Sequence, residues 1–347
     1  MAHTQRKAIY LLIPLLLLVA VAAGGKSWLE EKLQPAHPGA ASQMLTVPPG
    51  SSTRDVAELL QQQGLIKDAV VFRYYARYRQ LDGKLQGGQY ELSAAMTPEQ
   101  ILQKLARGEV VVRRFTVPEG LTVAEMADLL AEKKLVDREA FLKAAAASKL
   151  NAAYLPKDLQ LAQPLEGYLF PATYDYKPGI TPEEILAMMF AQWEHVFAPD
   201  LQAKAKALGM TVHEAMSLAS IIEEEAQVAA ERPVISGVYH NRLAIGMKLD
   251  ADPTVAYAVG KPVGQPLLYA DLEVESPYNT YRNAGLPPGP IAAPGKDSIL
   301  AAVSPAKHDF WYFVAREDGS GQHFFASTLA EQDVNIEKAR QNAAAKK

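Results

Sequence analysis

Cysteine is absent from the 347 residues of this chain. The absence excludes disulfide bonds, a thiol nucleophile, a zinc site with thiolate ligands and a lipid-modified N-terminal cysteine. A large excess of charge of one sign is lacking too, because the formal net charge is −4 and no run of Lys and Arg lies beyond the N-terminus. The sequence therefore gives no reason to expect nucleic acid as a partner, and a neutral or weakly charged polymer fits better.

Several catalytic motifs are also missing or incomplete. His213-Glu214 begins like the metalloprotease motif H-E-x-x-H, but Ser217 stands where the second His ligand belongs. His240, His308 and His323 lack the spacing of metal ligands, and we interpret them as structural or surface residues. Neither the G-x-S-x-G motif of serine hydrolases nor a Gly-rich phosphate loop occurs. We therefore expect neither a metal nor a cofactor.

The sequence has one long apolar run, residues 8–25, which would span about 27 Å as a helix. Arg6 and Lys7 precede it, so the positive-inside rule predicts a cytoplasmic stub at 1–7 and export of the rest of the chain. We expect a single-pass anchor in the inner (cytoplasmic) membrane, with the bulk of the chain periplasmic or extracytoplasmic. A cleaved signal peptide is the alternative, because Ala20-Val21-Ala22 offers a cleavage site. Pro and Gly in residues 26–43 indicate a short stem.

An internal repeat follows the stem. Thr46-Val47-Pro48-Pro49-Gly50 returns as Thr116-Val117-Pro118-Glu119-Gly120, and the offset of 70 residues also relates the apolar positions that follow. Each copy predicts a short strand, a Pro/Gly turn and a capped amphipathic helix. The layout of residues 44–150 is similar to that of carbohydrate-binding LysM domains, although two such copies can equally build a plain structural platform.

Residues 151–347 have a different pattern of predicted elements. Longer helices alternate with a loop-rich stretch at 260–297, and residues 310–315 and 322–326 predict a hairpin. Together with the hydrophobic content of 49%, this pattern predicts a folded α+β protein. We expect an N-terminal transmembrane helix, small LysM-like α/β modules, and a mixed α+β catalytic domain in which one helix carries a catalytic Glu.

Glu223 is the candidate for that catalytic residue. It lies at the edge of an apolar stripe with helical spacing, where partial burial beside two further carboxylates disfavours ionisation. A solvated acidic helix face that pairs with Arg232 or Arg242 remains the alternative. Glu225 cannot be the partner carboxylate across one glycosidic bond, because two residues turn a helix by about 200°. A second carboxylate would have to come from elsewhere, and the candidates are Glu166, Asp250 and Asp252.

A dense set of motifs carries a resemblance to a known family. The motifs are Glu166-Gly167-Tyr168-Leu169-Phe170-Pro171, Ala219-Ser220-Ile221-Ile222-Glu223-Glu224-Glu225, Tyr239-His240-Asn241-Arg242-Leu243, Gly246-Met247, Asp252-Pro253-Thr254, Tyr278-Asn279-Thr280-Tyr281, Gly285-Leu286-Pro287-Pro288-Gly289-Pro290-Ile291 and Pro294-Gly295. In this order and spacing, from about residue 44 to 340, the chain resembles the endolytic murein transglycosylases, the MltG or YceG-like family.

The resemblance implies cleavage of the β-1,4 bond between N-acetylmuramic acid and N-acetylglucosamine in nascent peptidoglycan, without water. The family's catalytic glutamate falls on Glu223 and the second glutamate of its acidic cluster on Glu225. Glu223 would protonate the leaving oxygen and then deprotonate the muramyl 6-hydroxyl, which leaves a 1,6-anhydromuramyl end. Peptidoglycan glycan strands are the implied substrate, and a membrane-bound peptidoglycan synthase is a hypothesis for a protein partner.

Further residues are candidates for binding the glycan. Tyr278, Asn279 and Tyr281 can hydrogen-bond sugar amides and stack on pyranose faces, but Asn279 can equally stabilise its own turn. Glu166 either lines the cleft or anchors the loop of Tyr168. The alternative to the enzyme is a non-catalytic peptidoglycan-binding scaffold of the wall-synthesis machinery.

Overall fold

The structure is a computed structural model that describes residues 24–157, 159, 161–262 and 265–346. The predicted stub and nearly all of the predicted anchor lie outside the described residues; of residues 8–25 only the last two are described, and they begin a helix that runs over 24–32. No helix within the described part is long and apolar enough to cross a membrane.

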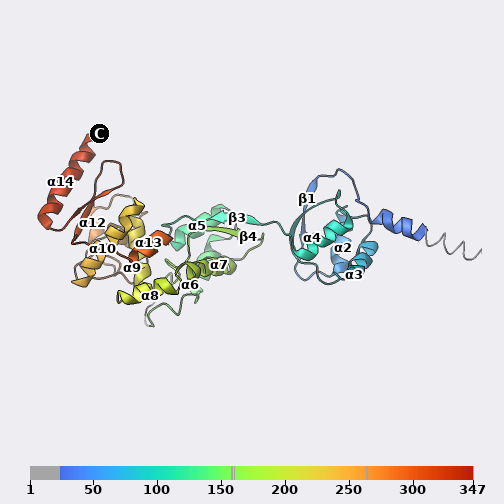
Figure 1. The fold of residues 1–347 in the computed structure, drawn as a ribbon, viewed down its shortest axis with the longest axis horizontal. Helices are drawn as coiled ribbons and strands as arrows, with labels where there is room; N and C mark the ends of the chain where they lie inside the picture. Colours follow the sequence, from blue (N-terminus) through green and yellow to red (C-terminus); the bar gives the residue numbers. More distant parts are fainter. Residues whose placement is uncertain (1–23, 158, 160, 263–264, 347) are drawn as a thin grey trace, which may run out of the picture. The chain divides into compact units, whose positions relative to one another are not determined.

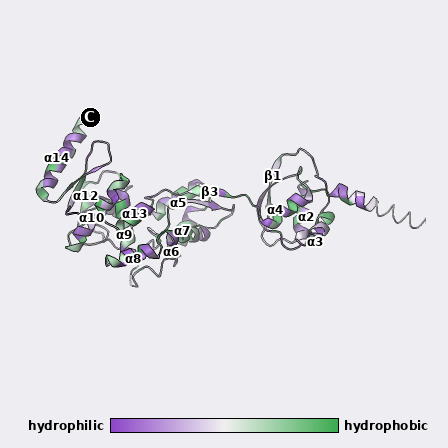
Figure 2. Ribbon diagram, viewed as in Figure 1, coloured by the Kyte–Doolittle hydropathy of each residue, from purple (hydrophilic) through white to green (hydrophobic). Residues whose placement is uncertain are grey.

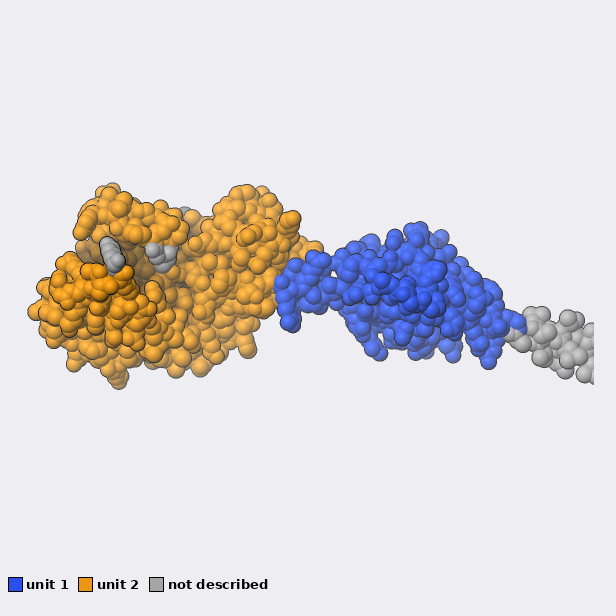
Figure 3. Space-filling model, turned by 90° about the horizontal axis from the view of Figure 1, so that it is seen from above, with its two compact units in different colours: residues 1–114, 175–178 blue, residues 115–174, 179–347 orange. Residues whose placement is uncertain are grey.

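The chain forms two compact units, which are coloured separately in Figure 3. Unit 1 comprises residues 1–114 and 175–178, and unit 2 comprises 115–174 and 179–347. The boundary between the two units lies after residue 114, inside the predicted repeat region. The units therefore do not coincide with the predicted domains, 44–150 and 151–347. The predicted domains stay a prediction about function.

Unit 1 is built around one antiparallel strand pair, β1 (Ser42–Val47) and β2 (Gly88–Ser93), in which Leu45 lies opposite Tyr90. Unit 1 also contains three helices: α2 (Thr53–Gln62), α3 (Ala69–Tyr78) and α4 (Pro98–Arg107). Each begins where a Ser, Asp or Thr side chain caps its free amides. The inward sides of the strands and helices form a single apolar core.

The second copy of the repeat has the same order of elements as the first: strand, helix, helix, strand. It consists of β3 (Arg113–Thr116), α5 (Val123–Glu132), α6 (Arg138–Ala147) and β4 (Thr173–Tyr176), and β3 pairs with β4. The turn after the first strand of each copy needs a left-handed residue, and Gly50 and Gly120 supply it with φ of 78° and 80°. The LysM-like nature of these copies stays a prediction.

The remaining elements belong to unit 2, whose helices contain both hydrophobic and hydrophilic residues, coloured green and purple in Figure 2. They are α7 (Pro182–Val196), α8 (Pro199–Ala207), α9 (Val212–Glu225), the short 3₁₀ helix η1 (Ala229–Glu231), α10 (Arg232–Ala244), α11 (Asp252–Val259), α12 (Tyr269–Leu272), α13 (Lys296–Ala302), the antiparallel hairpin β5 (Tyr312–Ala315) and β6 (His323–Ala326), and α14 (Leu329–Ala345). Helix α9 is central, because α8, α10, α11 and α13 all pack against it. Of these helices, α8, α10 and α13 are labelled near α9 in Figure 1. The prediction of a mixed α+β fold is confirmed.

Candidate active site

Glu223 lies in the last turn of α9. The helix begins at a capping box, in which Thr211 and Glu214 satisfy each other's backbone amides, and almost every side chain up to Ile222 is buried. The Glu223 side chain is only 8% exposed, so it is not part of a solvated acidic face. A carboxylate held this far from water must be supported by the groups around it.

One loop lies along α9 and supplies part of that support. His213 shares a 2.7 Å hydrogen bond with the carbonyl oxygen of Pro288, Ser220 accepts one of 3.0 Å from the amide of Ile291, and Glu223 Oε2 accepts one of 2.9 Å from the amide of Gly295. Residues 213, 220 and 223 are spaced to share one side of a helix. The predicted loop-rich stretch is thereby fixed at three points and delivers a backbone donor to Glu223.

Arg232, the first residue of α10, supplies a charged partner. Its Nη2 lies 3.4 Å from Glu223 Oε1, and its Nε donates a 2.9 Å hydrogen bond to Ser298 on α13. The predicted alternative of a pairing with Arg232 is thus present, but inside the site rather than on an open surface. Both carboxylate oxygens of Glu223 therefore have a donor, one neutral and one cationic.

Glu119 is a residue that the sequence reasoning missed. It belongs to the turn between β3 and α5, which is tied to the loop before α13 by hydrogen bonds of 2.9 Å from Gly120 to Ala293 and from Ala293 to Leu121. The Glu119 carboxylate lies against the Cα of Gly295, in the space that a side chain there would fill. Partial burial and then the negative charge of Glu223 raise the pKa of Glu119. The repeat itself could have indicated Glu119, because the first copy has Pro49 at the equivalent position and the turn therefore does not require a Glu.

Glu224 and Glu225 contact different surroundings, as their positions on the helix require. Glu224 Oε1 is buried without a hydrogen-bond partner among the described residues and lies against Gly120. Burial, and then Glu223, raise the pKa of Glu224 to about 8. Glu225 accepts a 3.0 Å hydrogen bond from the hydroxyl of Tyr239, and burial raises its pKa to about 7. Both carboxyl groups that follow Glu223 in the chain therefore have pKa values raised into the range of neutral pH.

Glu166 is buried and joins three segments. It accepts a 3.0 Å hydrogen bond from the amide of Val123, at the start of α5, and one of 3.3 Å from the hydroxyl of Tyr257 on α11. Burial raises the pKa of Glu166 to about 8. The ring of Tyr278 packs on Tyr257 with a centroid distance of 4.9 Å. These contacts give Glu166 the geometry of an anchor between elements, and its predicted contact with substrate stays a prediction.

Asn279 is fully buried, and its amide is used within its own loop. Nδ2 donates to the carbonyl oxygens of Leu272 and Val274 at 2.8 and 2.9 Å, and Oδ1 accepts from the amide of Tyr281. The Tyr281 hydroxyl in turn donates a 2.6 Å hydrogen bond to Asp252. The structure therefore gives Asn279 the turn-stabilising contacts that the sequence offered as one of two interpretations.

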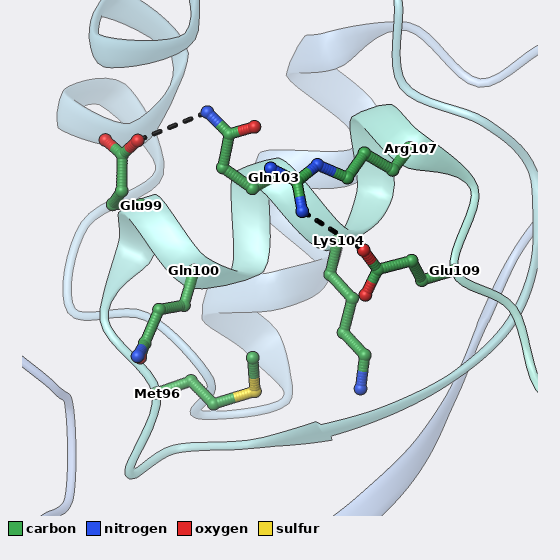
Figure 4. Close-up of a pocket in the computed structure, with 7 residues that line it drawn as sticks. All are labelled: Met96, Glu99, Gln100, Gln103, Lys104, Arg107 and Glu109. Atoms are coloured by element: carbon green, nitrogen blue, oxygen red, sulfur yellow. Dashed lines mark hydrogen bonds and ion pairs between the residues drawn. The ribbon is translucent and has the colours of Figure 1, made fainter.

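Unit 1 has a polar pocket of its own, on one side of α4 and about 340 Å³ in volume (Figure 4). Its charged and amide groups are largely paired with neighbours. Gln103 donates to Glu99 at 3.2 Å, and Arg107 forms an ion pair with Glu109 at 3.5 Å. Because these groups satisfy one another, the pocket holds no group prepared for acid–base chemistry.

The arrangement around Glu223 can move protons. A carboxyl group with 8% exposure, one cationic partner, one amide donor and a second carboxylate nearby has the contacts of a general acid and base. The surface of unit 2 is hollowed on the face that Figure 3 shows. Fold and site thus define an α+β protein with a largely buried carboxyl group whose contacts suit acid–base chemistry.

The model of the YceG-like family matches residues 45–338, which is most of the chain. The chain belongs to this family. It is 38% identical over 308 residues to the endolytic murein transglycosylase of Bacillus subtilis, covering 85% of this chain and 84% of the relative. The endolytic murein transglycosylase of Streptococcus pneumoniae D39 is 31% identical over 363 residues, covering 96% of this chain and 65% of the relative.

A solved structure has a similar fold. The crystal structure of a YceG-like protein from Listeria monocytogenes, at 2.6 Å resolution, superposes with a TM-score of 0.58 at 35% sequence identity. The match covers 84% of this chain and 98% of that one. The predicted family membership is therefore confirmed.

Proposed function

We propose that this protein is a lytic transglycosylase that cleaves the β-1,4 bond between N-acetylmuramic acid and N-acetylglucosamine within peptidoglycan glycan strands. The observation that carries the proposal is the placement of Glu223, buried in the last turn of α9 with a donor on each oxygen. The names of the relatives from B. subtilis and S. pneumoniae support the same activity.

The proposed mechanism uses Glu223 twice. As the bond between C1 and the bridging oxygen breaks, the carboxylic acid gives its proton to that oxygen, which leaves with the bonding electrons. Glu223 is then a carboxylate, and Arg232 and the Gly295 amide stabilise its charge. It next takes the proton of the muramyl 6-hydroxyl while that oxygen bonds to C1. The product is a 1,6-anhydromuramyl end, and Glu223 returns to its first protonation state.

Other parts of the chain receive roles by the same proposal. Residues 8–25 anchor the protein in the inner membrane by a single pass, and the LysM-like copies in 44–150 hold the glycan strand. Glu225, Tyr278 and Tyr281 support or contact the strand near the cleavage point. A membrane-bound peptidoglycan synthase is the proposed protein partner, since a membrane-anchored enzyme acts on newly made strands.

The test is mass spectrometry of the muropeptides that the full chain in detergent releases from purified peptidoglycan, beside its Glu223→Gln variant. We expect anhydromuramyl ends from the wild type and a loss of roughly 100-fold or more in the variant, because Gln cannot donate and recover the proton. Binding of glycan and the thermal unfolding midpoint should stay unchanged.

Two other outcomes would contradict the proposal. Reducing ends from the wild type would mean hydrolysis by water. A folded wild type that binds glycan but releases no product would mean the non-catalytic peptidoglycan-binding scaffold.

A further inference from the structure

The two copies of the repeat differ at one position of an otherwise shared turn. The first copy reads Thr46-Val47-Pro48-Pro49-Gly50 and the second Thr116-Val117-Pro118-Glu119-Gly120, and both end on a left-handed Gly. In each copy the residue before that Gly lies against another glycine, Gly87 in the first and Gly295 in the second. The turn folds with Pro in one copy, so its backbone does not require Glu119.

The second turn carries its carboxylate into the site of Glu223. Gly295 lies between the two groups: its amide donates to Glu223 at 2.9 Å, and the Glu119 carboxylate occupies the space that a side chain on its Cα would fill. The hydrogen bonds between residues 120–121 and 293 fix this arrangement. Glu119 is faced by Glu223 from α9, Arg232 from α10 and Asp297 from α13. No group within the described part of the chain donates a hydrogen bond to its carboxylate, which leaves the oxygens free for a ligand.

We propose that Glu119 is a second catalytic carboxylate, which faces the same sugar as Glu223 and stabilises the positive charge that develops at the anomeric carbon. The inference rests on the proposed function. When the glycosidic bond breaks, its electrons leave with the bridging oxygen, and C1 and the ring oxygen share a positive charge until the 6-hydroxyl oxygen attacks. Glu119 forms no bond and moves no proton in this sequence. Its negative charge lowers the energy of the charged sugar more than that of the neutral substrate.

Glu119→Gln tests this role, with Glu183→Gln as the control because Glu183 is an exposed carboxylate in the first turn of α7. We expect Glu119→Gln to lower kcat roughly 10- to 100-fold with a smaller change in KM, since the lost interaction is made in the transition state. The products should still be anhydromuramyl ends. The alkaline limb of the pH profile should move to lower pH, because the site then carries one negative charge fewer.

A second variant separates charge from shape. Glu119→Asp keeps the negative charge on a shorter side chain, so we expect a lower kcat with the alkaline limb where the wild type has it. Wild-type kcat and pH profile in Glu119→Gln would overturn the inference. So would a Glu119→Gln chain that fails to fold, because Glu119 would then be structural. An inactive wild type would instead overturn the proposed function.

A different observation concerns unit 1. The helix over residues 24–32 and α3 together form an apolar pocket of about 700 Å³, whose exposed members are Trp28, Leu29, Val70, Tyr74 and Tyr78. Tyr78 is 80% and Trp28 51% exposed. Large aromatic side chains in such numbers on one surface are typical of an interaction site. We call this group of side chains the aromatic surface.

We infer that the aromatic surface lies in the headgroup region of the bilayer. Only two residues separate Trp28 from the uncharged run 8–25, and Trp and Tyr are enriched at membrane interfaces because an apolar ring carries a polar tip. Lys26 flanks the surface, and Arg73 lies over the ring of Tyr74 with 5.2 Å between its Cζ and the ring centroid, which suits anionic headgroups. This inference rests on the proposed anchor.

The lack of cysteine allows a clean test. A fluorophore on Tyr74→Cys, in the full chain reconstituted into vesicles, should be quenched by brominated lipids. The same fluorophore on Met44→Cys should not be, since Met44 is an exposed apolar residue of unit 1 on β1, outside the aromatic surface. Flotation reports the anchor separately. Floating protein with neither site quenched, or with both quenched equally, would overturn the inference alone, and protein that does not float would overturn it together with the anchor.

Discussion

At the scale of single residues, Gly295 decides how closely two carboxylates approach. Its φ of −73° is open to any residue, so a left-handed backbone does not explain the glycine. The explanation is contact, because a Cβ would overlap the carboxylate of Glu119. The same residue donates its amide to Glu223. Gly295 therefore positions both groups without contributing a side chain.

Gly295→Ala should lower activity by displacing Glu119 while the backbone and its hydrogen bond to Glu223 persist. A displacement of roughly 1 Å of a catalytic group lowers rates by up to about 100-fold. In the Glu119→Ala background the same substitution should cost little, because the overlap is gone. Initial rates of the four proteins of this double-mutant cycle measure the coupling. Equal losses in both backgrounds would show instead that the substitution acts through Glu223.

At the scale of elements, the sequence predicts helix α9 but not the contacts of the turns and loops that lie around it. The capping box of Thr211 and Glu214 marks its start in the sequence, and the apolar stripe places Glu223 at the edge of the buried side. The hairpin of β5 and β6 has a similarly local signal in its alternating residues and Gly-rich turn.

The contacts between irregular segments had no such signal. The turn carrying Glu119 is joined to the loop before α13 by two backbone hydrogen bonds, across more than 170 residues of sequence. Because backbone N–H and C=O groups are nearly the same in every residue, no pattern of side chains predicts the hydrogen bonds between these two segments. Asn279 shows a related limit, because an Asn can hold a turn or bind a ligand, and only its three hydrogen bonds distinguish the two.

At the scale of the whole molecule, one repeated motif has two uses. The first copy builds the core of unit 1, and the turn of the second copy brings Glu119 and Gly120 to the end of α9 in unit 2. Several carboxyl groups are consequently buried together. Burial raises the pKa of Glu166 and Glu224 to about 8 and that of Glu225 to about 7.

These raised pKa values predict how the stability of unit 2 depends on pH. Each group has a higher pKa folded than unfolded, where Glu titrates near about 4.3, so the folded state binds more protons between these values. The contribution of these protonated groups to the free energy of unfolding is therefore fully present below the unfolded pKa. It is lost as the pH rises through the folded pKa values of about 7 to 8. Glu224→Gln removes one such group, whose Oε1 has no hydrogen-bond partner in the described part to lose.

We therefore expect Glu224→Gln to raise the thermal unfolding midpoint of unit 2 relative to wild type at pH 8 and to change it far less at pH 5. Trp193 and Trp311 both lie in unit 2, so fluorescence of a Trp28→Phe background follows that unit alone. Glu183→Gln serves as the exposed control and should show no such pH dependence. A difference between Glu224→Gln and wild type that is the same at both pH values would mean that Glu224 acts on stability through packing rather than through its proton.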